Sequence, residues 1–346
     1  MANILYDLII PKVLINYVRA FDNEVLRPQA QWNLDTWLPN VLTDDLDFRI
    51  RKGTFQDVDI AEYRAWDTPA RMTGRPGVSI IQGSLGPVSR QIPLGEEEYL
   101  RSKTLMSGNN DPIIQAIYQD SERMMRAVQG RIEMARGDLI DDGKVQIAEN
   151  GLTLTADFGR QSLMRKTAGT LWTTTATATP LSDLLSWQMD YLTVNGMVPA
   201  TMLIPLVRIS SLALNVEMRN YAAANGTVPQ RLNRAAINDV FANEGLPLLQ
   251  IFDEQVRKDG AVTRVLAVNK VFLMPPPSEP LGATFYGVTA EAQLLQSKGY
   301  IDATEAPGVV AVVTHTEHPV QTYTVGTAIA LPAMPNPDLV LDAVVA

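Results

Sequence analysis

Residues 111–139 read DPIIQAIYQDSERMMRAVQGRIEMARGDL, which is the strongest helical signal in this chain of 346 residues. Asp111 and Pro112 begin a helix, because aspartate is a favourable N-cap and proline fits the first turn. Apolar residues then recur at steps of three, four or seven from Ile113 onward, so they share one face of the helix. A helix from Pro112 to about Arg136 is roughly 40 Å long, at about 1.5 Å per residue. Such a helix spans a whole domain.

Two features of this helix concern its packing. Gly130 and Gly137 are poor helix formers, so we expect the last turns to fray or bend. Three methionines, Met124, Met125 and Met134, are expected to pack in the core, as flexible apolar side chains do, rather than to form a cofactor site.

The stretch before the helix, residues 46–94, reads as a long two-stranded excursion, here called the extended loop. Residues 47–51 and 54–60 alternate in polarity as strands do, and residues 78–80 return as a strand. Residues 68–77, TPARMTGRPG, are dense in turn formers and supply a basic tip. An isolated hairpin is marginal in water, so this one must lie on its own domain or on a neighbouring subunit. An ordinary surface ribbon is the alternative.

The N-terminal stretch, residues 1–45, reads as an arm. Residues 4–26 are expected to form a short amphipathic helix, with Pro11 breaking its first half. The residues that follow, including Trp32 and Trp37, read as an irregular segment with aromatic anchors. The alternative for Trp37 is an ordinary core residue.

After the long helix, the sequence predicts two hairpin turns and then a mixed α/β region. Residues 141–144 (DDGK) read as one hairpin-type turn, and Asn150-Gly151 as a second one between strands at 145–148 and 152–155. In the second half, helices are predicted after Thr179-Pro180 and over 208–224 and 231–244, and strands over 201–206, 248–252, 262–268, 271–274, 284–288 and 309–314.

The composition excludes several classes of function. There is no cysteine, which excludes disulfides, zinc–thiolate sites and thiol nucleophiles. A net charge of −9 argues against tight non-specific binding of nucleic acid. Charged residues make up 19%, below the usual share of about a quarter, which favours a surface largely covered by other subunits. No membrane span and no signal peptide are expected.

The two histidines, His315 and His318, are the first candidates for a metal site, because they lie three residues apart. The residues before them are β-like and Pro319 follows, so the two rings are expected to point apart. A serine hydrolase would need one of these histidines as its base.

Other catalytic patterns do not occur in the sequence. There is no Gly-x-Ser-x-Gly elbow, no P-loop and no Gly-x-Gly-x-x-Gly fingerprint. The adjacent carboxylates Asp44-Asp45 and Asp141-Asp142 favour solvated turns over a cation site. We therefore expect no catalytic residue, no metal and no cofactor.

Four short strings follow one another along the chain. They are Trp37-Leu38-Pro39-Asn40, Asp157-Phe158-Gly159-Arg160, residues 281–289 (LGATFYGVT), and Pro335-Asn336-Pro337-Asp338 with Leu339-Val340-Leu341. None is specific alone. Together with the order of the elements, they resemble the lambda-type major capsid protein family of tailed bacteriophages (major capsid protein E), and the resemblance covers nearly the whole chain.

This resemblance implies an α+β fold, the tailed-phage major capsid protein fold. Its implied parts are an N-terminal arm (1–45), an extended β-hairpin loop (46–94), a peripheral domain with the spine helix and a β-hairpin (95–179), an axial α/β domain (180–318), and a C-terminal strand that returns to the peripheral domain (319–346).

The resemblance also implies a structural role without enzymatic activity. Hexamers and pentamers of the chain would close into an icosahedral shell around double-stranded DNA, which they enclose without sequence-specific binding. Implied partners are the chain itself, a scaffolding protein, a portal and a decoration protein, with no membrane. The place implied is the virion capsid, assembled in the cytoplasm of the bacterial host. Candidate inter-subunit contacts are Arg71 and Arg75, which suit acidic neighbours, and Trp37.

Three other functions stay open. An encapsulin-like compartment shell has the same fold but a protein cargo. A phage tail-tube protein would form rings or tubes, and the long helix counts against it. An α/β enzyme requires a substrate-dependent activity that disappears when a specific carboxylate is replaced.

Overall fold

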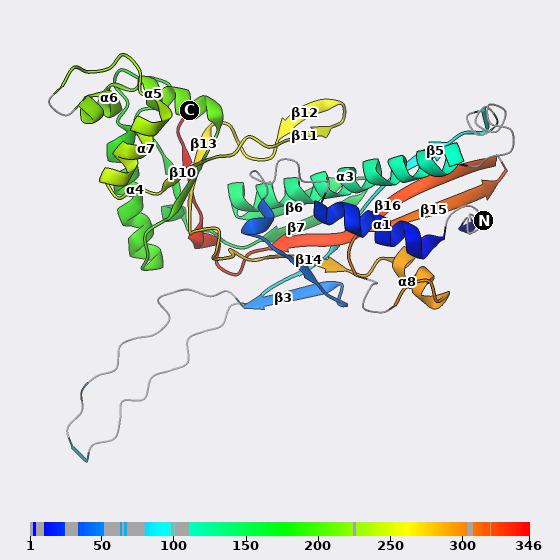
Figure 1. The fold of residues 1–346 in the computed structure, drawn as a ribbon. Helices are drawn as coiled ribbons and strands as arrows, with labels where there is room; N and C mark the ends of the chain where they lie inside the picture. Colours follow the sequence, from blue (N-terminus) through cyan, green and yellow to red (C-terminus); the bar gives the residue numbers. More distant parts are fainter. Residues whose placement is uncertain are drawn as a thin grey trace.

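The computed structural model describes residues 3–4, 10–24, 34–51, 63, 66–67, 80–97, 100, 111–223, 226–302, 307–318 and 320–346. One long helix and two sheets form the frame of the molecule (Figure 1). The helix lies along the larger sheet, and the smaller sheet is surrounded by a separate group of helices at one end.

The long helix, α3, spans Asp111–Asp142 and so confirms the strongest prediction from the sequence. It continues six residues past the expected end at Arg136 without fraying at its glycines. A Cβ added at Gly137 would lie 2.4 Å from the carbonyl oxygen of Val265, so close packing against another segment requires a glycine there. The two helix glycines therefore do not mark the helix end.

A six-stranded sheet supports α3. Its longest strand, β16, pairs with β15, β14 and β5, and a Cβ added at Gly326 of β16 would lie 2.8 Å from Cβ of Met124 on α3. Helix and sheet therefore touch closely at this point. The strands are β1 (Asn3–Ile4), β2 (Asn40–Leu42), β5 (Gly86–Leu94), β14 (Ala283–Gly287), β15 (Val310–Glu317) and β16 (Val320–Ala333).

A five-stranded sheet forms the centre of the second region. All four residues of β9 are buried, as is typical of a strand in the core. β9 pairs in parallel with β10 and antiparallel with β13, and the sheet continues through β17 to β8. The strands are β8 (Arg165–Thr167), β9 (Thr201–Ile204), β10 (Leu248–Ile251), β13 (Lys270–Met274) and β17 (Leu341–Val344).

The division of strands between the two sheets differs from the expected boundaries. The resemblance implies one axial unit over residues 180–318, but β14 and β15 within that range pair with β16 of the six-stranded sheet. Within residues 319–346, β16 lies in the six-stranded sheet, whereas β17 joins the five-stranded sheet together with β8. Strand patterns identify strands but not their partners, because partners come from distant sequence.

Three two-stranded ribbons complete the strands of the described residues. Asn150 and Gly151, at φ 49° and φ 83°, turn between β6 and β7, which confirms the predicted hairpin. The other predicted turn, at residues 141–144, is instead the end of α3, with Gly143 at φ 66°. A glycine with positive φ occurs both in hairpin turns and at helix ends, so the local sequence does not distinguish a hairpin turn from a helix end. The ribbons are β3 (Asp47–Arg51) with β4 (Ile80–Ser84), β6 (Lys144–Glu149) with β7 (Leu152–Asp157), and β11 (Gln255–Lys258) with β12 (Ala261–Arg264).

The base of the extended loop is the ribbon β3–β4. Asp47 lies opposite Ser84, and Arg51 lies opposite Ile80, in an antiparallel register. This pairing confirms that the loop leaves the body as two strands. Its predicted strand at 54–60 and its basic tip lie outside the described residues.

The N-terminal helix, α1, spans Pro11–Glu24 and packs on the body (Figure 1). Pro11 begins the helix rather than breaking it, because the first turn has no need of a proline N–H. Leu14 and Val18 are buried against Ile117 of α3 and Val313 of β15.

The remaining helices match the sequence pattern with one difference. The pattern predicts one helix over 208–224, but Asn215 separates two, because its side-chain oxygen accepts a hydrogen bond from the N–H of Met218 at 3.0 Å and caps the second. The helices are α4 (Pro180–Asn195), α5 (Leu206–Leu214), α6 (Val216–Ala223), α7 (Arg234–Asn243) and α8 (Ala290–Ser297), with short 3-10 turns η2 (Leu34–Thr36), η3 (Ser162–Met164) and η5 (Pro337–Leu339).

Candidate assembly interface

The residues predicted to contact neighbouring subunits fall in different places. Arg71 and Arg75 lie outside the described residues. Trp37 is only 1% exposed, and its indole N–H donates to the carbonyl oxygen of Pro275 at 3.4 Å. The chain turns inward at η2, so this side chain packs in its own subunit's core and offers no surface to a neighbour. The structure therefore places Trp37 where the alternative interpretation expects it.

A buried network on α3 holds the end of the arm. The guanidinium of Arg136 donates to Glu133 at 2.7 Å, to Thr284 at 2.9 Å and to the side-chain oxygen of Asn40. Glu133 also accepts a hydrogen bond from the backbone N–H of Leu34 at 2.7 Å. One ion pair on α3 thus joins the arm and β14, and its charges are satisfied inside the subunit.

Glu254, in the loop after β10, adds a second carboxyl group beside this network. Burial, reinforced by the neighbouring Glu133 carboxylate, raises the pKa of Glu254 to about 8. Glu254 therefore binds a proton at neutral pH in the folded chain, which is the cheaper form for a carboxyl group away from water.

A second buried network joins the C-terminal end of α3 to the five-stranded sheet. Arg160 donates to the last carbonyl groups of α3 at 2.8–3.3 Å and to Asp342 of β17 at 3.0 Å. Lys270 of β13 pairs with Asp141 at 2.6 Å and with Asp342 at 3.3 Å. Burial raises the pKa of Asp141, whereas the hydrogen bond from Lys270 acts in the opposite direction. Asp141 is therefore part of an ion-pair network rather than of a solvated turn.

The four strings that carry the resemblance meet in pairs. Asp338 accepts hydrogen bonds from the backbone and side chain of Gln161, the residue after the second string, at 2.7 and 2.9 Å. The backbone N–H of Leu281 donates to the carbonyl of Trp37 at 2.8 Å, and Thr284 pairs with Asn40 between β14 and β2. Residues in or next to these strings therefore connect segments that lie far apart in the sequence.

The two histidines do not form a joint site. His315 lies on β15, opposite Asn3 of β1, and its Nδ1 atom is buried without a hydrogen-bond partner, whereas His318 is an exposed residue of the following turn. Among the described residues, no group of three or more histidine, cysteine, aspartate or glutamate side chains could hold a metal ion.

Exposed apolar side chains gather at the base of the extended loop. Leu42, Leu46 and Ile80 are each more than half exposed, and they lie on β2, before β3 and at the start of β4. A single subunit leaves these side chains in water, although burying each one is favourable by about 1.5–3 kcal/mol. The base of the loop is therefore a surface suited to a neighbouring chain.

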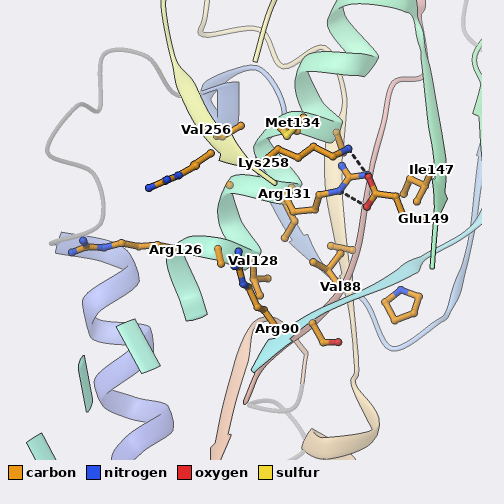
Figure 2. A pocket seen from close by; sticks show the side chains of 18 of the residues that line it. Val88, Arg90, Arg126, Val128, Arg131, Met134, Ile147, Glu149, Val256 and Lys258 are labelled. Carbon is orange, nitrogen blue, oxygen red and sulfur yellow. Dashed lines mark hydrogen bonds and ion pairs between the residues drawn. The ribbon is translucent and has the colours of Figure 1, made fainter. Parts of the chain in front are cut away.

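A groove beside α3, here called the basic groove, was not expected from the sequence. Its volume is about 800 Å³, and it lies between α3, β5, the β6–β7 turn and the β11–β12 ribbon. Figure 2 shows Arg131 and Lys258 converging on Glu149, whereas Arg126 points away from this cluster. Arg123 and Arg126 lie three residues apart on α3, and this spacing on one face was the available sequence signal.

No helix in the described part of the chain combines the length and the apolar character needed to cross a membrane.

Solved structures resemble this fold over its full length. A protein assigned as a prophage capsid protein, from E. coli CFT073, is 14% identical at a TM-score of 0.64, with 100% of each chain covered. A phage-related protein from Bordetella bronchiseptica RB50 is 11% identical at a TM-score of 0.55, with 97% of this chain and 96% of that chain covered. At these identities the likeness shows a shared fold, that of tailed-phage capsid proteins.

No curated protein matches the chain. The model of the family described as phage major capsid protein E matches residues 40–345. This range includes α3, the base of the extended loop and all five strands of the smaller sheet. The chain therefore belongs to the phage major capsid protein E family, whose members are structural subunits of the capsid shell.

Proposed function

We propose that the chain assembles into hexamers and pentamers that close into an icosahedral shell around phage double-stranded DNA. The observation that carries this proposal is the base of the extended loop. There, Phe48 of a paired ribbon is buried in the core of its own subunit, but large apolar side chains around the ribbon stay exposed. Permanent interfaces bury about 2,000 Å² or more and are comparatively apolar, which is what such a surface provides.

In this proposal the two sheets have different places in a capsomer. The six-stranded sheet with α3 forms the peripheral domain, and the five-stranded sheet with α4 to α7 forms the axial domain near the capsomer centre. Arg71 and Arg75 at the loop tip pair with carboxylates of a neighbour. The net charge of −9 keeps the wall from gripping the DNA that it encloses.

The remaining parts of the proposal concern partners and place. The subunit acts without catalysis, metal or cofactor, and assembly takes place in the cytoplasm of the bacterial host. A scaffolding protein, a portal and a decoration protein are the proposed partners besides the chain itself, and no membrane takes part.

Two variants test the role of the extended loop. Deletion of residues 68–78, and the double substitution Leu46→Asp with Ile80→Asp, should each leave a folded subunit that assembles poorly. The matched control is Val262→Asp, an exposed side chain on β12, which should still form shells. Circular dichroism reports folding, and negative-stain electron microscopy reports assembly.

Each outcome has a distinct meaning. Normal shells from the deletion contradict the role of the loop. Persistent wild-type monomers at high concentration, with scaffolding protein supplied, contradict the shell itself. Shells that hold a protein cargo instead of DNA support the compartment alternative, and rings or tubes support the tail-tube alternative.

A further inference from the structure

The basic groove keeps an excess of positive charge after its own ion pairs are formed. Glu149 accepts from Arg131 at 3.4 Å and from Lys258 at 2.7 Å, so one carboxylate serves two cations. Arg126 already has an interaction partner and adds nothing to the excess. The other basic residues that line the groove are Arg90, Arg123, Arg131, Arg257 and Lys258, against the acidic residues Glu149 and Asp259.

Two further contacts do not remove this excess. Arg123 pairs with Asp120 at 3.1 Å, so five basic residues are matched by three carboxylates. Arg257 donates to the carbonyl group of Gly260 at 3.3 Å, which carries no charge. An acidic occupant would therefore meet an electrostatically favourable rim.

The floor of the groove is apolar. Val128 and Ile132 of α3 and Ile147 of β6 are buried beneath it, and Val88 and Val256 are half-buried at its sides (Figure 2). A phosphate backbone gains nothing from such a floor, whereas a peptide with apolar and acidic side chains uses both floor and rim. The groove therefore suits an acidic peptide segment that also carries apolar side chains.

One wall of the groove is a strand with an open edge. Four consecutive residues of β5, numbers 87–90, line the groove. β5 pairs with β16 on one side, and the described residues supply no partner strand on its other side. An open edge carries backbone groups that can pair with a further strand, so an extended segment fits along this wall.

The extended loop divides its charges along the sequence. Residues 55–67 (FQDVDIAEYRAWD), here called the acidic segment, contain four acidic residues and one basic residue among apolar ones. Residues 68–79 contain two basic residues, Arg71 and Arg75, and no acidic one. Residues 54–60 alternate as a strand does, with Val58 and Ile60 on one face. The acidic segment therefore matches the rim, the floor and the open edge, whereas the loop tip does not.

The acidic segment does not fill the groove of its own chain. Its described residues Tyr63 and Trp66 are 109% and 96% exposed, and no described residue of the extended loop lines the groove. Figure 1 shows β3, where the loop leaves the body, and the β11–β12 ribbon on opposite sides of the body. Burying each aromatic side chain is favourable by about 1.5–3 kcal/mol, so these two suit a contact with another chain.

Every copy of the chain carries both complementary surfaces. A contact between an acidic segment and a groove joins two different surfaces, so it is heterologous and can be repeated from copy to copy. Repeated heterologous contacts close into rings when the rotation between copies allows it. Such rings are what hexamers and pentamers require.

We propose that the acidic segment of one copy docks in the basic groove of the next copy. This inference rests on the proposed function, because it names the surface of the neighbouring subunit that receives the loop. Asp57 and Asp59 meet arginines of the rim, and Val58 and Ile60 lie over the floor beside β5.

Cysteine cross-linking tests the contact directly, because the chain has no cysteine of its own. Two variants, Val58→Cys in the acidic segment and Ser89→Cys on β5, are mixed in equal amounts and oxidised. A disulfide requires Cα atoms about 4.4–6.8 Å apart, so docking should give a covalent dimer on a denaturing gel, beyond what either variant forms alone. Val58→Cys mixed with Arg234→Cys, an exposed position on α7, is the matched control and should stay monomeric.

Charge reversal tests the chemistry of the same contact. Asp57→Lys with Asp59→Lys on the segment, or Arg90→Glu with Arg257→Glu on the groove, should each lower the yield of cross-linked dimer about tenfold or more. Mixing the reversed segment with the reversed groove should restore the yield, which shows that both variants are folded. Unchanged yields in the single reversals would overturn the inference.

A variant with both cysteines separates the two possible sources of the segment. Val58→Cys with Ser89→Cys in one chain should give a ladder of covalent oligomers. A disulfide within single chains, at the mass of a monomer, would overturn docking on a second copy. No disulfide from Val58→Cys or from Tyr63→Cys with Ser89→Cys would overturn docking in this groove.

Electron microscopy of the same preparations separates this inference from the proposed function. Wild-type shells together with no cross-link between segment and groove overturn the docking inference alone. Cross-linked copies of a chain that never forms shells support the docking surface and contradict the proposed shell.

Discussion

The charged side chains around the C-terminal end of α3 are buried, whereas those along its middle are exposed. At the C-terminal end, Arg160, Asp342 and Lys270 are largely buried and pair with one another and with the last carbonyls of the helix. Along the middle, Arg123 and Arg126 are exposed on the rim of the basic groove.

This difference separates charges that serve the fold from charges available for association. A buried ion without a partner is costly, so the junction charges require one another to remain charged. An exposed ion pair contributes only about 0–1 kcal/mol, so the rim charges are dispensable for folding. Loss of a junction charge should therefore affect stability, and loss of a rim charge should affect binding.

The largest expected effect comes from the junction. Arg160→Met leaves Asp342 with one cation fewer and leaves the last carbonyls of α3 without a donor, so the free energy of unfolding should fall by about 3–5 kcal/mol. The control Arg123→Ala removes an exposed pair and should change it by less than about 0.5 kcal/mol. Denaturant titration measures the free energy of unfolding of both variants. Equal losses would contradict the distinction between junction charges and rim charges.

The two glycines of α3 provide a second contrast, of intermediate size. Gly137→Ala places a methyl group against the backbone of Val265 and should destabilise the subunit by about 1–3 kcal/mol. Gly130→Ala meets ordinary contact and should stabilise it by about 0.5–1 kcal/mol. Thermal unfolding of both variants measures the signs, and destabilisation by Gly130→Ala would contradict an open floor.

The smallest effect is a dependence on pH. Because the pKa of Glu254 is raised to about 8 in the folded chain, its contribution to stability is complete below the unfolded value near 4.5 and is lost as the pH rises through 8. The loss should amount to about 1–2 kcal/mol, after allowance for partial exposure. Glu254→Gln should remove this slope, and the exposed control Glu279→Gln should keep it. Unfolding titrations between pH 5 and pH 9 measure the slope; an unchanged slope in Glu254→Gln would falsify the assignment.

Sequence patterns predicted the helices and turns that depend mainly on neighbouring residues. The apolar period of α3, the Asn150-Gly151 turn and the Pro180 start of α4 all depend on neighbouring residues, and each appears in the structure. The same patterns misread Gly143 as a hairpin turn, since a left-handed glycine also ends a helix. They also left Trp37 undecided between core and interface.

Other features depended on contacts across long stretches of chain. The sequence did not predict that Arg160, at the end of α3, would pair with Asp342, which lies 182 residues further along the chain. It also did not predict that β17 would join β13, about seventy residues before it. The basic groove combines residues from α3, β5, β6–β7 and β11–β12, so no single window of sequence contains it.

The sequence by itself determined the long helix and the paired base of the extended loop. It also excluded cysteine chemistry and contained, in order, the four short strings that resemble those of a capsid subunit. Only the tertiary structure decided which charges are buried together, which sheet each strand joins and where arginines surround an apolar floor. The physical reason is that helix and turn preferences act between neighbouring residues, whereas burial and charge pairing act between segments that folding alone brings together.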